Sequence, residues 1–168
     1  DIWGYVIGGV LPPRPLPAPS NLTATTVSSY PPRIDLAWKD NSSEEMGFEI
    51  QRKEEVGGTW TSIYAAVRNT TAYSDTSYVY RGRTYYYRIR AFRGDISSDY
   101  SNEAWAGVPT FYDVPVTESF WQDVEAIFRE HITVGCSTNP PLYCPYDDMT
   151  RAQMAVFLCR AAGKRPLY

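Results

Sequence analysis

The sequence predicts a multi-domain, mostly β protein in which an antiparallel sandwich is followed by a small two-helix module closed by a disulfide. Three observations lead to this fold class. Short segments with apolar residues at every second position, separated by turn residues about every 8 to 12 positions, are typical of a β-sandwich. Two cysteines enclose a Pro-rich loop near the C-terminus. Apolar strand formers begin the chain, so an extended N-terminal strand is expected before the sandwich.

Residues 1–18 are expected to form an apolar strand and a Pro-rich spacer. Five of the eight positions in 12–19 are proline, which favours extended backbone that holds the preceding segment away from the sandwich. Two interpretations stay open: a tail or strand folded onto its own domain, or a strand donated to a neighbouring subunit. The second interpretation predicts a subunit interface formed by Ile2, Trp3, Tyr5, Ile7 and Val10.

Residues 19–108 carry the strands of the sandwich. Side chains alternate between the two faces of a strand, so apolar residues at every second position mark the face that packs in the core. The expected inward rows are Ile34, Leu36 and Trp38; Phe48 and Ile50; and Tyr85, Tyr87, Ile89 and Ala91. This part contains no cysteine, so its apolar core must stabilise it alone.

Several of these segments resemble a bacterial fibronectin type III domain over the whole of 19–108. The matching segments are Leu36-Ala37-Trp38-Lys39-Asp40-Asn41-Ser42, Gly47-Phe48-Glu49-Ile50-Gln51-Arg52 and Thr84-Tyr85-Tyr86-Tyr87-Arg88-Ile89-Arg90-Ala91. The resemblance implies a seven-stranded, all-β sandwich with Trp38 in the core. It also implies that Tyr85 occupies a corner where its hydroxyl bonds to nearby backbone. Such domains mostly serve as spacers or adhesive modules.

Residues 111–163 are expected to form the helical module. The linker of residues 109–110 is too short to act as a free hinge, so the two domains should touch. A first helix is expected over 119–130, with Ser119 and Gln122 as a capping box at its start. Its apolar stripe would consist of Phe120, Val124, Ile127 and Phe128. A second helix is expected from Met149 or Thr150 to about Ala162, followed by Gly163 as a left-handed cap.

Cys136 and Cys144 flank a short loop and are predicted to form a disulfide. A module of about 50 residues buries little apolar surface, and closing this loop would contribute about 2–3 kcal/mol of stability. Such a bond indicates an oxidising, extracellular location. Cys159 has two interpretations, packing inside the last helix or pairing with another chain, of which packing is favoured.

The helical module resembles a single S-layer homology module of bacterial surface proteins. The matching segments are Phe111-Tyr112-Asp113-Val114-Pro115, His131-Ile132-Thr133-Val134-Gly135 and Thr150-Arg151-Ala152-Gln153. In wall-binding members the Arg of the last segment contacts an anionic glycan, which makes Arg151 the candidate for binding a cell-wall glycan here. A capping box between Thr150 and Gln153 explains that segment without a ligand, so structural use is favoured. Ser119 and His131 also depart from the common Trp and Gly of the family.

Composition and motifs argue against several other functions. The formal charge of −3 and the absence of a Lys/Arg run disfavour nucleic acid, and no apolar run reaches the length of a membrane span. One histidine and no phosphate loop, CxxC or HExxH motif indicate no catalytic residues, no metal and no cofactor. The N-x-Ser/Thr pattern marks Asn21, Asn41 and Asn69 as candidates for N-glycosylation.

The sequence thus predicts a structural, extracellular cell-surface protein without enzymatic activity. Self-association into a homo-oligomer, filament or layer is expected through donation of the N-terminal strand. Two alternatives remain: a carbohydrate-binding anchor that uses the helical module, and a non-catalytic spacer fragment of a larger secreted enzyme.

Overall fold

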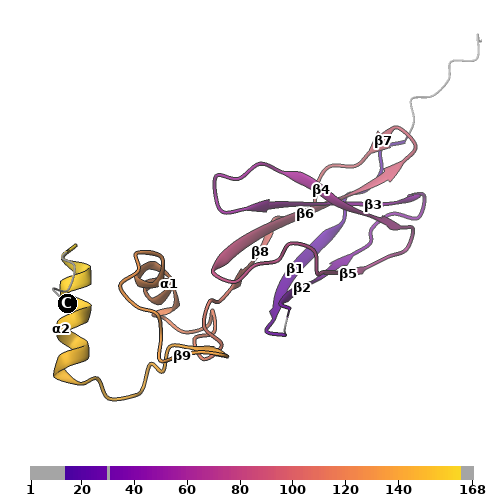
Figure 1. The fold of residues 1–168 in the computed structure, drawn as a ribbon. Helices are drawn as coiled ribbons and strands as arrows, with labels where there is room; N and C mark the ends of the chain where they lie inside the picture. The colour runs from indigo at the N-terminus through magenta and orange to yellow at the C-terminus, as the bar shows by residue number, and fades with distance from the viewer. Residues whose placement is uncertain (1–13, 30, 164–168) are drawn as a thin grey trace, which may run out of the picture.

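A computed structural model of the chain describes residues 14–29 and 31–163 (Figure 1). The expected N-terminal strand and its interface residues Ile2, Trp3, Tyr5, Ile7 and Val10 lie outside the described residues. Strand donation therefore stays a prediction.

The described part of residues 14–108 forms two antiparallel sheets. One sheet has the order β1-β2-β5, and the other has the order β4-β3-β6-β7, with β8 pairing to β6. The strands are β1 (Ser20–Val27), β2 (Arg33–Lys39), β3 (Gly47–Glu54), β4 (Thr61–Val67), β5 (Ala72–Asp75), β6 (Arg83–Arg93), β7 (Ile96–Ser97) and β8 (Ala104–Val108). The inward rows of both sheets meet in one core, which confirms the predicted sandwich.

Two side chains named from the sequence hold this sandwich as expected. Trp38 is buried and meets Phe48 edge-on, with 5.7 Å between the ring centroids. The Tyr85 hydroxyl accepts a hydrogen bond from the N–H of Tyr80 at 2.9 Å and donates one to the carbonyl of Tyr78 at 3.2 Å. These bonds form a tyrosine corner, so both predictions are confirmed.

Residues 14–19 of the Pro-rich spacer pack against the sandwich, whereas the N-terminal strand that the spacer is expected to hold away lies outside the described residues. Leu16 is buried and belongs to the core cluster of the sandwich. The side-chain amide of Asn41 donates to the carbonyl of Ala18 at 2.8 Å. Extended, proline-rich backbone still carries side chains and free carbonyls, and here both contact the sandwich. The sandwich domain therefore begins before residue 19.

A buried charged network lies where β5 meets the core. Asp75 is fully buried, and its carboxylate accepts hydrogen bonds from Arg52 at 2.7 Å and from the Tyr87 hydroxyl at 2.9 Å. The N–H of Ser77 donates to the other carboxylate oxygen at 3.2 Å. Burial and the neighbouring charge of Asp75 raise the pKa of Tyr87 far above its ordinary value, so Tyr87 stays a hydrogen-bond donor.

Helix α1 (Trp121–Arg129) starts two residues later than predicted, and the expected Ser119–Gln122 capping box is wrong. Phe120 is the N-cap, and no side chain caps the helix. The N–H of Trp121 donates to the carbonyl of Glu118 at 3.1 Å, so a backbone turn serves the helix start instead. The later start also changes the buried face.

The buried face of α1 differs from the predicted stripe of Phe120, Val124, Ile127 and Phe128. Val124 is buried as expected, together with Trp121 and Glu125. Phe128 remains 37% exposed, although its ring meets Phe111 edge-on at 5.3 Å. Helix α1 thus buries the carboxylate of Glu125, which the predicted apolar stripe did not include.

A short hairpin with a disulfide follows α1. Strands β9 (Ser137–Thr138) and β10 (Pro141–Leu142) pair, and Cys136 is bonded to Cys144 as the sequence predicts. The carboxylate of Asp113 accepts the N–H groups of Tyr143 at 2.8 Å and of Cys144 at 2.7 Å. The disulfide loop is therefore fixed to the segment that leaves the sandwich.

Helix α2 (Arg151–Ala161) has the predicted boundaries. Thr150 and Gln153 form the expected capping box, and Gly163 follows with a φ of +67°. The preferred interpretation of Cys159 is wrong, because this free cysteine is exposed on α2. It is also absent from the cavity that other residues of α2 line, so apolar packing does not account for it.

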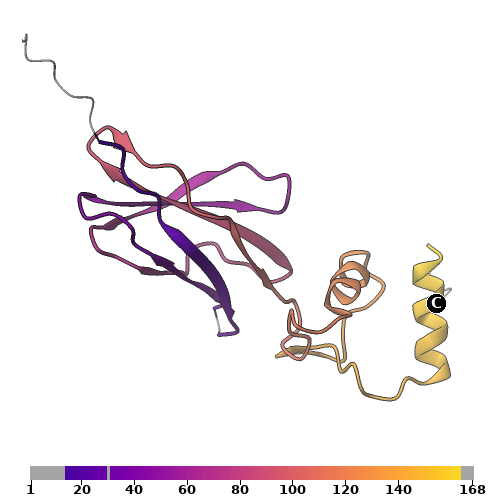
Figure 2. The same ribbon diagram turned by 180° about the vertical axis from the view of Figure 1, so that it is seen from behind.

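Both views place the helical module at one end of the sandwich, with α1 between the sandwich and α2 (Figures 1 and 2). In the described part of the chain, neither helix has the length and apolar character needed to cross a membrane.

Candidate functional site

Three of the candidate residues named from the sequence, Asn21, Asn41 and Asn69, are all exposed. The side-chain nitrogen of Asn41 already donates to the carbonyl of Ala18 at 2.8 Å and to the Ser20 hydroxyl at 2.9 Å. This nitrogen is the atom to which a glycan would attach, and because attachment replaces one of its two hydrogens, modification would remove at least one of these bonds. Asn21, at the irregularity in β1, and Asn69, in the turn after β4, have φ angles of 56° and 59°, in the left-handed region that Asn tolerates.

Arg151, the candidate for binding an anionic glycan, is exposed at the first turn of α2. It lines neither of the two cavities described below. Arg160 lies on a different face of the same helix. It lines the second cavity and donates a hydrogen bond to the carbonyl of Ile132 at 3.2 Å. The structure thus places the candidate arginine on an open surface.

The two domains are joined by buried hydrogen bonds at the linker. Glu125 of α1 accepts the N–H of Thr110 at 2.6 Å and the Thr110 hydroxyl at 2.7 Å. The guanidinium of Arg81 donates to the carbonyl of Pro109 at 3.1 Å and stacks on the ring of Tyr112 at 3.7 Å. Both oxygens of Glu125 are used, so this carboxylate fixes the position of α1 rather than serving a ligand.

Replacement of Glu125 by alanine is expected to lower the stability of the junction by about 1–3 kcal/mol, because the buried N–H of Thr110 loses its acceptor. Hydrogen exchange at the Thr110 amide would become faster, while exchange at the amides of β3 would not change. Glu118→Ala is the matched control, since Glu118 precedes α1 and makes no side-chain hydrogen bond with any residue whose position is described. Equal exchange rates in both variants would contradict the assignment of Glu125.

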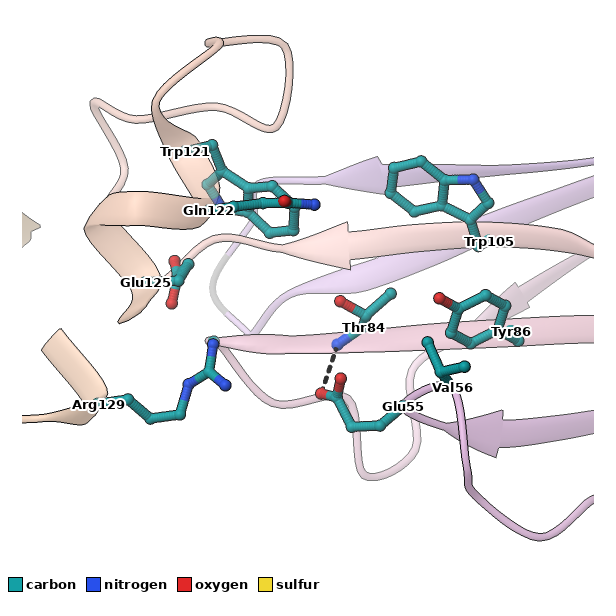
Figure 3. A pocket seen from close by; sticks show the side chains of 10 residues that line it. Glu55, Val56, Thr84, Tyr86, Trp105, Trp121, Gln122, Glu125 and Arg129 are labelled. Atoms are coloured by element: carbon teal, nitrogen blue, oxygen red, sulfur yellow. Dashed lines mark hydrogen bonds between the residues drawn. The ribbon is translucent and has the colours of Figure 1, made fainter. Parts of the chain in front are cut away.

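A cavity of about 310 Å³ lies between the sandwich and α1, and we call it the junction cavity (Figure 3). The sandwich contributes Glu55, Val56, Thr84, Tyr86 and Trp105. Helix α1 contributes Trp121, Gln122, Glu125 and Arg129 from one face. The N–H of Thr84 donates to the Glu55 carboxylate at 3.2 Å across its floor. Aromatic and polar groups therefore meet in one hollow.

The outer face of the larger sheet carries stacked aromatic and basic side chains. Lys53 and Arg88 both lie 4.4 Å from the ring centroid of Trp60. Arg88 also lies 3.9 Å from the ring of Tyr100. Trp105 differs, because it is 53% exposed and no cation or ring stacks on it among the residues with described positions. The sheet thus presents one open indole at the edge of the junction cavity.

A second cavity, of about 510 Å³, separates α2 from the segment of residues 132–149. Val156 and Phe157 of α2 line this cavity, and both side chains are only partly buried. On the opposite wall, burial raises the pKa of Tyr143. None of the residues of α2 is buried. This helix therefore makes few contacts with the rest of the chain.

Across residues 14–29 and 31–163, no group of three or more His, Cys, Asp or Glu side chains is close enough together to hold a metal ion. The acidic pair Asp147 and Asp148 is exposed just before α2.

Comparison with known proteins assigns no family: no family model matches, and no curated protein matches significantly. Among solved structures, the chain is similar to an Fn3-like protein from Clostridium thermocellum, with 27% identity, a TM-score of 0.48, and coverage of 57% of this chain and 96% of that chain. A myokine structure has 17% identity, a TM-score of 0.47, and coverage of 57% and 99%. A β-1,2-glucanase from Parabacteroides distasonis has 18% identity, a TM-score of 0.44, and coverage of 70% and 14%.

The chain itself shows a β-sandwich with features expected of the predicted Fn3-type domain. Two antiparallel sheets share one core, and Tyr85 makes the tyrosine corner. The junction cavity was not predicted from the sequence. The exposed aromatic residue at its edge follows from β8 pairing with β6, which sets Trp105 opposite Tyr86.

Proposed function

We propose that this chain is a structural, non-catalytic module of an extracellular surface protein, and that it self-associates through α2. The observation that carries the proposal is the composition of α2: apolar residues lie around its whole circumference, and its charges are Arg151 and Arg160 near its ends. Helices of this composition are normally buried on all sides. Here no residue of α2 is buried, and Met154 and Leu158 are 45% and 61% exposed.

A second copy of the chain is the partner that the charges favour. Asp147 and Asp148 are exposed before the start of α2, and Arg160 is exposed near its end. In an antiparallel pair of α2 helices, the acidic pair of each copy would face Arg160 of the other. Met154 lies near the midpoint between these charges, where the two-fold axis would pass. Self-complementary surfaces of this kind are typical of isologous dimers.

The finer identity of the helical module belongs to this proposal. Two helices flank a disulfide-closed loop, and Thr150 and Gln153 cap α2, which supports a module similar to an S-layer homology module. The disulfide supports an extracellular location. Donation of the N-terminal strand would then add a second, open contact between dimers, and repeated open contacts build filaments.

We do not favour a wall anchor that acts through Arg151. This side chain lies outside both cavities, and the capping box accounts for Thr150 and Gln153. A spacer fragment of a larger secreted enzyme remains the alternative, in which α2 packs against another part of that protein.

The experiment is sedimentation equilibrium of the full chain over the micromolar range. The wild-type chain is expected to dimerise, and the M154Q/L158Q variant is expected to stay monomeric with an unchanged circular dichroism spectrum, because neither side chain is buried. Tyr146→Gln is the matched control, since Tyr146 is 81% exposed outside α2 and should leave the dimer intact.

A chain that lacks residues 1–11 tests the second contact. It should still form the α2 dimer and should lose any larger assembly. A wild-type chain that remains monomeric throughout the concentration range would contradict self-association and favour the spacer alternative. Larger assemblies that survive the deletion would contradict strand donation alone.

A further inference from the structure

We propose that the junction cavity binds a short segment of an uncharged saccharide, with the open face of Trp105 as its stacking platform. This site is separate from α2 and from Arg151, so it does not depend on the proposed function. Residues from both domains line it, and the buried bonds of Thr110 with Glu125 hold the two walls in place.

The aromatic wall is the first argument. Trp105 on β8 lies directly opposite Tyr86 on β6, and both side chains line the cavity. On the same sheet face, the rings of Trp60 and Tyr100 are covered by Lys53, Arg88 or Arg90. Trp105 is left open, as described above. A flat, amphipathic ring surface suits the C–H face of a sugar ring, whose hydroxyl groups then point to the polar walls.

The polar walls are the second argument. Glu55 is an acceptor, Arg129 is a donor, and the amide of Gln122 is both. Sugar hydroxyl groups donate and accept, so they can use all three, whereas an apolar ligand would leave them without partners. Val56 is the single aliphatic side chain of the lining. The composition therefore favours a polyhydroxylated ligand over a lipid.

The indole N–H of Trp121 is the third argument. The side chain is 7% exposed and lines the cavity, yet its Nε1 has no hydrogen-bond acceptor in the described part of the chain. Buried donors are rarely left without a partner, and such an exception calls for an explanation. The nitrogen itself has almost no surface open to solvent, so a ligand hydroxyl, or a water molecule that the ligand orders, would supply the acceptor once the indole turns to expose its N–H to the cavity.

Charge and size define the ligand further. The lining contains two carboxylates, of Glu55 and Glu125, and one guanidinium, of Arg129. Its net charge is therefore −1. This charge disfavours an acidic glycan of the kind expected for Arg151. A volume of about 310 Å³ lies at the lower end of the range of about 300–1,000 Å³ for ligand pockets, which suits a short segment or chain end.

The test is an NMR titration of the full chain with cellotetraose and, separately, with chitotetraose as neutral probes. Each of the five tryptophans carries one indole N–H, which gives one signal per side chain to follow. We expect the signals of Trp105 and Trp121 to shift and saturate with at least one probe, while that of Trp38 in the sandwich core does not move. Trp105→Ala should weaken the binding by about tenfold or more.

Two further variants keep the test decisive. Gln122→Ala removes an exposed polar group of the cavity and should also weaken binding, whereas Tyr146→Ala, which lines neither cavity, should not. The proposal is overturned if neither probe shifts the Trp105 and Trp121 signals, or if Trp105→Ala binds as tightly as the wild-type chain. Binding that only Arg151→Ala abolishes would also overturn it, because the site would then lie on α2.

Discussion

Replacement of Arg52 by alanine is expected to lower the free energy of unfolding of the sandwich by about 3–5 kcal/mol. Arg52 donates to Asp75 at 2.7 Å, and Asp75 is fully buried. The substitution leaves a carboxylate in the core with only the Tyr87 hydroxyl and one backbone N–H as donors. Urea unfolding followed by tryptophan fluorescence would measure the loss.

Arg33→Ala is the matched control for this prediction. Arg33 also bonds an aspartate, Asp35, at 3.0 Å, but the two side chains are 43% and 39% exposed. Exposed pairs contribute about 0–1 kcal/mol, so the control should change stability little. The assignment is wrong if both variants lose the same amount. A double variant with methionine at Arg52 and leucine at Asp75 should recover part of the loss, because no buried charge remains.

Replacement of both Cys136 and Cys144 by serine is expected to destabilise the helical module by about 2–3 kcal/mol, since the open loop gains conformational freedom in the unfolded chain. The same loop is fixed by Asp113, whose carboxylate accepts the N–H groups of Tyr143 and Cys144. Faster hydrogen exchange at the amides of α1 and the β9–β10 hairpin, with unchanged exchange in β3 and β6, would report this local loss.

Cys159→Ser serves as the control for the disulfide, because Cys159 is free and exposed. The amides of this variant should exchange hydrogen at the same rates as those of the wild-type chain. Reduction of the disulfide in the wild-type chain should reproduce the faster exchange of the double serine variant. Uniformly faster exchange in the sandwich as well would show that the two domains unfold as one unit, contrary to the local effect expected here.

The local features of the fold could be predicted because each depends on neighbouring residues. Alternation along a strand identified Tyr85 and Tyr87 as inward, and the capping residues Thr150 and Gln153 located the start of α2. The capping box predicted at Ser119 is absent because a backbone turn at the start of α1 takes its place, and the sequence does not reveal such a turn.

The remaining features depend on contacts between distant segments. Leu16 reaches the core although prolines surround it, and Cys159 is exposed although its helix is apolar. The junction cavity needs the register of β8 on β6 and the position of α1 at once. Nothing local in the sequence indicated that Trp121 of α1 and Tyr86 of β6 would line the same cavity.

The disulfide also sets how far the chain can stretch under tension. Cys136 and Cys144 are separated by eight positions, and the segment between their Cα atoms would extend to about 28 Å in a fully stretched chain. The bond holds their Cα atoms 6.0 Å apart. A chain pulled at its ends would therefore transmit force across the disulfide, and the Pro-rich loop would carry none of the load.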